Sequence, residues 1–189
     1  MDFFDEYFNG YKQHAFTPSA ISLIKEFSAL AKQVQAAGNK MIFAGNGASS
    51  SLSSHGAVDF TKQGKVRSIT FHDPNLITCF SNDYGYDFWM QKALEYYADE
   101  GDVVVLISVS GESLSVVNAA KYARESNLTM VSFTGRSVEN TLKSLSDIAF
   151  HVPCHAYNIV ENIHGIWMTA AIDNLIGTSV YETQEILES

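Results

Sequence analysis

Apolar residues recur at helical spacing in the first part of the chain. The pattern opens at Thr17-Pro18, where an N-cap residue precedes a proline in the first helical turn. It continues until Gly38, with apolar residues at Ile21, Ile24, Phe27, Ala31 and Val34. The spacing predicts a long amphipathic helix within an N-terminal helical arm over about 1–38. A sheet domain is predicted over about 39–189.

Beyond this arm, short apolar runs alternate with helical patterns. The run Val103-Val104-Val105-Leu106-Ile107 is unbroken, which is typical of a strand buried on both faces of a parallel sheet. Further strands are predicted at 41–44, 66–71, 129–134 and 148–152, and helices at about 50–61, 73–80, 88–97, 112–126, 139–145 and 158–176. The alternation predicts one α/β domain over 1–189, a three-layer, doubly wound, five-stranded parallel sheet of flavodoxin-like type with an extra N-terminal helix.

Composition supports one globular domain and excludes several functions. The 189 residues are 46% hydrophobic and 17% charged, and no apolar run approaches the roughly 20 residues of a membrane span. The net charge of −9 argues against a general nucleic-acid surface, which would be basic. The first residues are acidic and aromatic, unlike a secretory signal, so a cytoplasmic location is expected. Cys79 and Cys154 lack paired spacing and are predicted to be buried free thiols.

Two loops rich in glycine and serine carry the strongest chemical signal. Residues 44–51 read Ala-Gly-Asn-Gly-Ala-Ser-Ser-Ser, residues 107–113 read Ile-Ser-Val-Ser-Gly-Glu-Ser, and each loop follows a predicted strand and opens a predicted helix. Glycine admits an anion close to the backbone, while serine hydroxyls and helical N–H groups donate to it. Neither loop is a Walker or dinucleotide motif, so no nucleotide cofactor is expected. Because both loops end parallel strands, they are predicted to converge on a small phosphorylated ligand.

Two pairs of polar residues add candidate chemistry. His55 and Asp59 lie four apart on the helix that leaves the first loop, so they share one of its faces. Glu161 and His164 lie three apart on the last helix, a spacing that can aim both side chains at one metal ion or one proton. On spacing alone, a surface His–Asp pair and a serine that merely caps a helix remain the simpler interpretations.

Several separated motifs, taken in order, resemble the sugar isomerase (SIS) domain family, and within it the phosphoheptose isomerases. The resemblance covers most of the chain. It rests on residues 45–49, the helix with His55 and Asp59, residues 82–86, 100–103 and 107–113, and Val152-Pro153 before the helix with Glu161 and His164. It implies isomerisation between sedoheptulose 7-phosphate and D-glycero-D-manno-heptose 7-phosphate. It further implies a homotetramer with sites shared between subunits, and zinc near the reacting carbons.

The resemblance also assigns roles to individual residues. It implies that phosphate is bound by Ser49, Ser108, Ser110 and Ser113, and that Asn46 and Asp83 approach the sugar. Gly47 is a further candidate for binding the substrate or its phosphate. Asp59 falls where the family carries a catalytic glutamate, and Glu161 falls where it carries glutamine. His55, Asp59 and Glu161 are the implied zinc ligands, and His164 is the candidate second acid or base.

Three departures leave two hypotheses open. Thr169 stands where the isomerases place their second catalytic histidine, and Gln63 replaces an arginine. The sequence Ser110-Gly111-Glu112-Ser113 is closer to other SIS proteins than to the heptose enzymes. The first hypothesis is an aldose–ketose isomerase that uses Asp59 as base. The second is a non-catalytic SIS module that binds a sugar phosphate or a protein partner.

Overall fold

The protein is built around one five-stranded sheet. The structure is a computed structural model that describes residues 2–180, so residues 1 and 181–189 of the predicted domain lie outside it. All strands are parallel and lie in the order β2-β1-β3-β4-β5. They are β1 (Met41–Gly45), β2 (Ser68–Thr70), β3 (Val103–Ser108), β4 (Thr129–Gly135) and β5 (Ile148–Val152). The predicted five-stranded, flavodoxin-like parallel sheet is confirmed.

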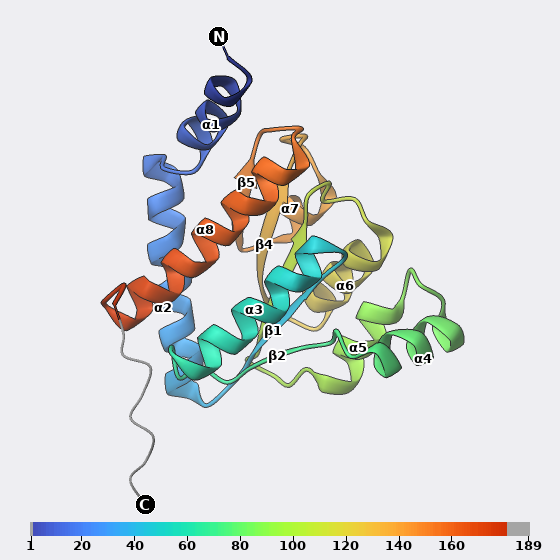
Figure 1. Ribbon diagram of the computed structural model, residues 1–189. Coiled ribbons are helices and arrows are strands. Elements are labelled where there is room, and N and C mark those ends of the chain that lie inside the picture. The colour runs from blue at the N-terminus through green and yellow to red at the C-terminus, as the bar shows by residue number, and fades with distance from the viewer. Residues whose placement is uncertain (1, 181–189) are drawn as a thin grey trace, which may run out of the picture.

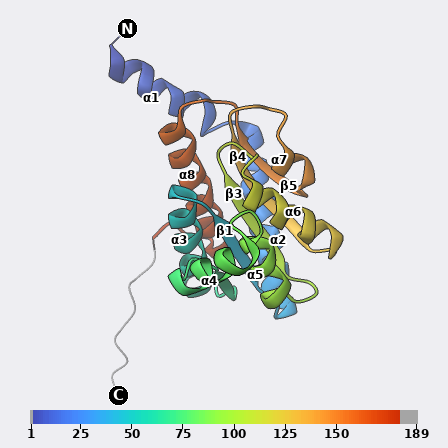
Figure 2. The ribbon, with the colours of Figure 1, turned by 90° about the vertical axis from the view of Figure 1, so that its right-hand side faces the viewer.

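Helices cover both faces of this sheet (Figure 1). They are α1 (Phe3–His14), α2 (Pro18–Ala37), α3 (Ala48–Lys62), α4 (Pro74–Tyr84), α5 (Trp89–Tyr97), α6 (Leu114–Glu125), α7 (Thr141–Leu145) and α8 (Tyr157–Ile176). Helices α2, α3 and α8 share one hydrophobic core with the sheet, and α5, α6 and α7 share the other. Figure 2 shows α3 and α8 on one side of the strands and α6 and α7 on the opposite side.

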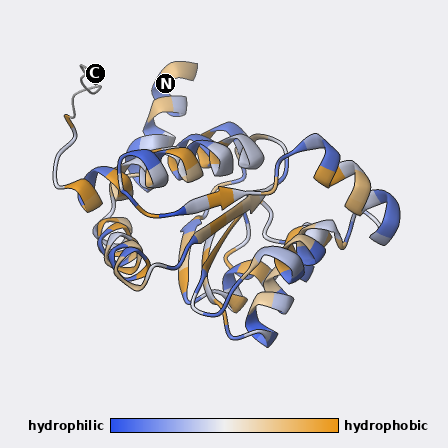
Figure 3. Cartoon of the chain, turned by 90° about the horizontal axis from the view of Figure 1, so that it is seen from below, coloured by the Kyte–Doolittle hydropathy of each residue, from blue (hydrophilic) through white to orange (hydrophobic). Residues whose placement is uncertain are grey.

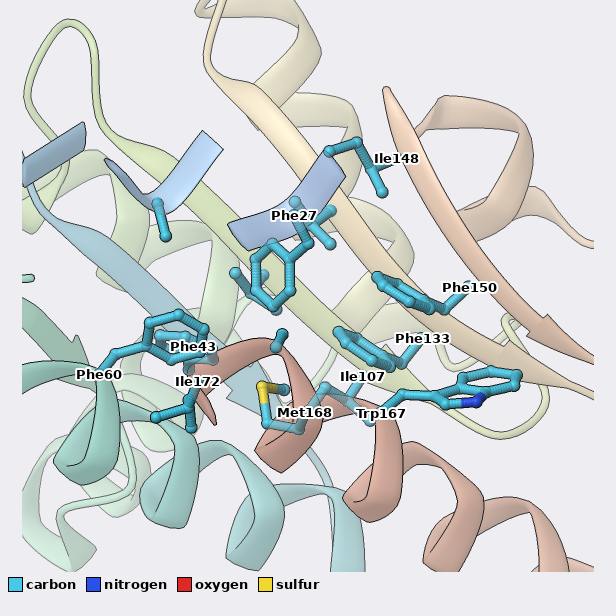
Figure 4. Packing of buried hydrophobic residues seen from close by; sticks show 14 of the residues in the cluster. Phe27, Phe43, Phe60, Ile107, Phe133, Ile148, Phe150, Trp167, Met168 and Ile172 are labelled. Atoms are coloured by element: carbon cyan, nitrogen blue, oxygen red, sulfur yellow. The ribbon is translucent and has the colours of Figure 1, made fainter. Parts of the chain in front are cut away.

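The alternation of side chains along each strand builds the two cores. On β3, Val105 and Ile107 face the α2, α3 and α8 side, while Val104 and Leu106 face the other helices. The whole strand is therefore buried, as its unbroken apolar run predicts. Figure 3 shows the hydrophobic strands enclosed between helices whose outer faces are more hydrophilic. Aromatic side chains dominate the first core, where the rings of Phe133 and Phe150 stack 4.4 Å apart (Figure 4).

The N-terminal arm divides into two helices. The second helix, α2, begins directly after Thr17, whose hydroxyl accepts the N–H of Ala20 and caps the helix. Helix α2 packs Phe27, Ala31 and Val34 into the core as predicted, but Ile21 is exposed. Helix α1 buries no residue and extends from the body of the molecule (Figure 1).

Two further predictions differ from the structure. Helix α4 continues to Tyr84 instead of ending near Phe80, because the first residue that breaks it is Gly85 at φ +87°. The prediction of buried thiols is wrong for Cys79, which is exposed on α4, and Cys154 is only half-buried. No helix within residues 2–180 has the length and apolar character needed to cross a membrane.

Candidate active site

The two glycine and serine loops meet in one cleft at the carboxyl edge of the sheet. Strands β1 and β3 are neighbours, and Gly45 pairs with Ile107 where the strands end. The cleft between the loops has a volume of about 290 Å³. It is lined by Asn46, Gly47, Ala48, Ser49, Ile107, Ser108, Val109, Ser110, Ser113, Tyr157 and Glu161. The prediction that the loops converge is thus met by the folded chain.

The first loop is tightly packed and presents the start of α3. A Cβ at Gly45 would lie 2.7 Å from the Cβ of Ser49 and 2.8 Å from the Ile107 carbonyl oxygen, so only glycine fits. Gly47, at φ +59°, is the N-cap residue of α3 and brings no side chain to the helix end. The N-terminal N–H groups and positive dipole of this 15-residue helix therefore face the cleft without a capping hydroxyl.

The amide of Asn46 is fixed from two sides. Its nitrogen donates to Ser115 Oγ at 3.0 Å, and its oxygen accepts the hydroxyl of Tyr86 at 3.0 Å. Tyr86 lies in the turn between α4 and α5, and Ser115 lies in the first turn of α6. Asn46 thus joins the first loop to two other elements, and it reaches the cleft in a fixed orientation.

The serines of the second loop lie close together and do not cap the helix that follows. Ser108 Oγ lies 3.4 Å from Ser110 Oγ and 3.5 Å from Ser113 Oγ, and it accepts the Gly111 N–H at 3.2 Å. Ser113 is the N-cap residue of α6, yet its side chain makes no capping hydrogen bond. The simpler interpretation, in which these serines only cap α6, therefore does not hold for Ser113. Its hydroxyl is available to a ligand.

The start of helix α7 packs against the second loop through Asn140 and Thr141. Gly111 has φ +68°, and a Cβ there would overlap Asn140 Oδ1. The carboxylate of Glu112 accepts the Thr141 N–H at 2.7 Å and the Thr141 hydroxyl at 2.9 Å. Glu112 is the residue by which the sequence of this loop differs from the loop implied for the heptose enzymes. It stabilises the start of α7 and does not line the cleft.

Asp59, the candidate base, lies outside the cleft that a single chain forms. The Nε2 atom of His55 lies 2.9 Å from Asp59 Oδ2, and the two side chains are 60% and 19% exposed. Both are on α3, the helix that begins at the first loop. Asp83 is exposed at the end of α4, where its carboxylate contacts only Asn82 and Cys79 among the described residues. Neither Asp59 nor Asp83 contributes to the lining that residues 2–180 provide.

Glu161 and His164, the two residues of α8 predicted to act together, point to different surroundings in the structure. Glu161 lines the cleft, and burial raises the pKa of its carboxyl group. His164 is fully buried between Phe133 and Trp167, where Nε2 contacts the Thr134 carbonyl oxygen at 2.9 Å. Burial lowers the pKa of His164 to about 4. An imidazole without exposed surface cannot reach a bound sugar, so the structure argues against the predicted acid–base role of His164.

Thr169 does not replace the missing histidine within this chain. Its hydroxyl donates to the carbonyl oxygens of Gly165 and Ile166 at 3.0 and 3.2 Å, inside its own helix. This is a common hydrogen bond for a helical threonine and leaves no free donor directed outward. Helix α8 therefore supplies no second acid or base for an isomerisation at His164 or at Thr169.

The implied zinc ligands are not brought together. Within residues 2–180, no three His, Cys, Asp or Glu side chains gather in a way that could hold a metal ion. His55 and Asp59 contact each other, whereas Glu161 lies at the cleft. The donors of one chain do not fit a zinc site of the type seen in proteins, which uses at least three protein ligands. Zinc therefore stays a prediction, and no reaction step is assigned to it.

Sequence reasoning missed Tyr157, which lines the cleft at the start of α8. Its hydroxyl lies 3.3 Å from the guanidinium of Arg136, whose carbon lies 5.7 Å from the centre of the tyrosine ring. Arg136 follows β4 with φ +60°, a conformation that is uncommon for residues other than glycine. A tyrosine at a helix start is also typical of ordinary packing, so the sequence held no specific signal for it.

The fold and the paired loops define an α/β domain with a cleft lined by serine hydroxyls and helix N-termini at the carboxyl edge of its parallel sheet. The chain belongs to the SIS domain family, whose model matches residues 6–135. Its relatives include proteins named phosphoheptose isomerase. The one from Fusobacterium nucleatum is 33% identical over 132 residues, covering 67% of this chain and 68% of that protein. The one from Salmonella paratyphi B is 32% identical over 159 residues, covering 80% and 77%.

A solved structure supports the same relationship. The phosphoheptose isomerase GmhA from Neisseria gonorrhoeae matches with a TM-score of 0.83 and 27% identity, over 91% of this chain and 94% of that chain. The resemblance predicted from separated sequence motifs is thus confirmed at the level of the family and of the fold.

Proposed function

We propose that the protein is a sugar-phosphate aldose–ketose isomerase of the phosphoheptose type, which interconverts sedoheptulose 7-phosphate and D-glycero-D-manno-heptose 7-phosphate. The observation that carries the proposal is the cleft in which two serine loops and the N-termini of α3 and α6 converge. Hydroxyl and N–H donors that line one cleft suit a phosphate dianion. The relatives named phosphoheptose isomerase support the same activity.

The proposed reaction passes through an enediol. One group removes the proton from the carbon beside the carbonyl, and a proton is then returned to the neighbouring carbon while protons move between the two oxygens. In a heptose 7-phosphate the reacting carbons C1 and C2 lie at the far end from the phosphate. Asp59 lies further along α3, the helix whose N-terminus faces the phosphate site, and is assigned as the base. His55 contacts its carboxylate and orients it.

A non-catalytic SIS module is the second candidate. It is favoured by the placement of Thr169, whose hydroxyl donates to its own helix, and of His164, which is buried. Such a module would bind the sugar phosphate through the same serine loops but would not exchange its protons.

Solvent exchange distinguishes the two candidates. The protein is incubated with sedoheptulose 7-phosphate in deuterium oxide, exchange is followed by NMR, and binding is measured by calorimetry. Deuterium at C1 or C2 together with aldose product supports the isomerase. Binding without exchange supports the non-catalytic module, and the absence of both binding and exchange contradicts both candidates.

Replacing Ser110 by alanine is expected to weaken binding of sedoheptulose 7-phosphate by roughly ten- to a hundredfold. Hydrogen bonds to a charged group contribute about 1.5 to 3 kcal/mol, and this hydroxyl lies among the donors of the second loop. Calorimetry measures the dissociation constant. Ser126→Ala, at the opposite end of α6, is the matched control and should bind as the wild type does. An unchanged constant for Ser110→Ala would remove this residue from the site.

We also propose that the protein forms a homotetramer whose sites are shared between chains. The proposal is supported by α1, which contains no fully buried residue and exposes Phe3, Phe4 and Phe8 by 67%, 60% and 55%. An apolar helix face of this kind is usually covered by a partner. A second chain near the cleft would also bring further groups to the sugar. The predicted cytoplasmic location stays a prediction.

Light scattering after gel filtration tests the assembly. The wild type is expected at about four times the 20.8 kDa chain mass. The double variant Phe4→Ser, Phe8→Ser should shift to a smaller species, because its α1 loses apolar contact area. Glu6→Gln, on the same helix, is the control and should keep the wild-type mass. A wild type that elutes as a monomer would contradict the proposal.

A further inference from the structure

His72 connects three elements beneath the first loop. It lies two residues after the end of β2, at the same edge of the sheet as the cleft. Its Nε2 atom lies 3.0 Å from the Gly45 carbonyl oxygen, at the end of β1. Its Nδ1 atom lies 2.6 Å from Thr70 Oγ1 and 3.4 Å from Ser54 Oγ on α3. No feature of the proposed reaction uses this imidazole.

These partners determine where the ring carries its proton. The Nε2 atom lies 3.4 Å from the Gly45 amide nitrogen, a potential donor, and 3.0 Å from the Gly45 carbonyl oxygen, which only accepts. Because the carbonyl contact is the shorter one, we assign the hydrogen to Nε2, which donates it to the Gly45 carbonyl. The Nδ1 atom then accepts the hydroxyl hydrogen of Thr70. Burial lowers the pKa of His72, which agrees with a neutral ring, and its edge packs against Trp89 with the ring centres 6.3 Å apart. The ring is thus held in one tautomer and one orientation.

The Gly45 carbonyl belongs to the peptide unit that opens the phosphate loop. In a trans peptide the carbonyl and the following N–H point in opposite directions, so a carbonyl held toward His72 directs the Asn46 N–H away from His72. Asn46, Gly47 and Ser49 line the cleft, and His72 does not. Gly45 has no side chain of its own that could lock this peptide, because a Cβ would meet Ser49 and Ile107.

We propose that His72 is a positioning residue for the phosphate cradle. Its Nε2–H fixes the Gly45–Asn46 peptide, so that the first loop is organised before the ligand arrives. The proposal rests on the proposed sugar-phosphate site and adds a residue that touches neither the ligand nor the reacting carbons. A loop organised in advance binds its anion without the cost of ordering the backbone.

Two substitutions separate the hydrogen bond from simple packing. In His72→Gln the side-chain amide nitrogen can occupy the place of Nε2 and donate to Gly45. His72→Leu fills the space but has no donor. Dissociation constants for sedoheptulose 7-phosphate and for inorganic phosphate are measured by calorimetry, KM and kcat by turnover, and the Asn46 amide resonance by NMR of the free protein.

His72→Leu is expected to raise the dissociation constants and KM by about fivefold, the effect of one lost hydrogen bond, with kcat within about twofold of the wild type. The Asn46 resonance should shift in His72→Leu and return toward its wild-type position in His72→Gln, along with affinity. The proposal is overturned if His72→Leu binds both ligands as the wild type does, or if His72→Gln is as impaired as His72→Leu.

The readouts also separate this proposal from the proposed function. A wild type that binds sedoheptulose 7-phosphate without turnover removes the isomerase assignment, while the dissociation constants still test His72. If His72→Leu does not fold, His72→Gln alone decides through its Asn46 resonance and its affinity. An Asn46 resonance that does not respond to either substitution contradicts the positioning role even where no ligand binds.

Discussion

Replacing Asp59 by asparagine is expected to lower kcat for the isomerisation of sedoheptulose 7-phosphate by about 10²- to 10⁴-fold, the usual contribution of a positioned general base. Asparagine has nearly the same shape and can still contact His55, which lies 2.9 Å from the carboxylate, but it cannot accept the proton from carbon. The phosphate loops are untouched, so KM should change little. Deuterium exchange into the substrate should fall in parallel with turnover.

Two variants make this result interpretable. Glu125→Gln removes an exposed carboxylate at the end of α6, away from the cleft, and should leave kcat and KM at their wild-type values. Asp59→Glu places at this position the residue that the family resemblance implies, and it should retain measurable turnover because a carboxylate remains. An Asp59→Asn protein with wild-type kcat and unchanged thermal stability would exclude Asp59 as the base.

The convergence of the two glycine and serine loops could be predicted from the sequence because their signal is local. Glycine and serine directly after an apolar run place a flexible, donor-rich backbone at a strand end, and parallel pairing brings such ends to one edge. Ser108, Ser110 and Ser113 needed only the position of β3 to be placed. Strands β1 and β3 were predictable for a similar reason, since parallel strands that are buried along their whole length have nearly continuous apolar sequences.

The roles of Glu161 and His164 could not be separated from the sequence. A spacing of three fixes the angle between two side chains on a helix, but not which of them meets the sheet. Helix α8 has a wide buried face that includes Ile163, His164 and Trp167, so the imidazole turned inward and the carboxylate remained at the cleft. The packing of α8 in the folded chain, where His164 meets Phe133 and Thr134 of β4, decides this outcome.

The contact between Glu112 and α7 could not be predicted from the sequence either. Glu112 lies within a serine loop, but its carboxylate reaches Thr141 at the start of α7, 29 residues later. Contacts of this length depend on how two loops pass each other in the folded chain. His72 was missed for the same reason, because its partners lie on β1, β2 and α3.

The buried imidazole of His164 is expected to make the protein sensitive to acid. Its pKa is lowered by burial to about 4 in the folded chain, against about 6.5 in an unfolded one. The unfolded state therefore binds more protons between these values, and the free energy of unfolding falls as the pH decreases from about 6.5 to 4. The neutral His164 ring makes its full contribution to the free energy of unfolding above pH 6.5. Acidification to pH 4 removes roughly 3 kcal/mol of this free energy.

His164→Gln tests this contribution, because glutamine does not titrate and its amide nitrogen can still donate to the Thr134 carbonyl. Burial also lowers the pKa values of His72 and His151, so some acid sensitivity remains in the variant. Urea unfolding at pH 7 and at pH 4.5 should show a difference between the two pH values that is about 2 to 3 kcal/mol smaller in His164→Gln than in the wild type. His155→Gln, an exposed site just before α8, is the control and should retain the wild-type difference. If wild type and His164→Gln lose the same stability on acidification, protonation of the buried ring is not what destabilises the fold.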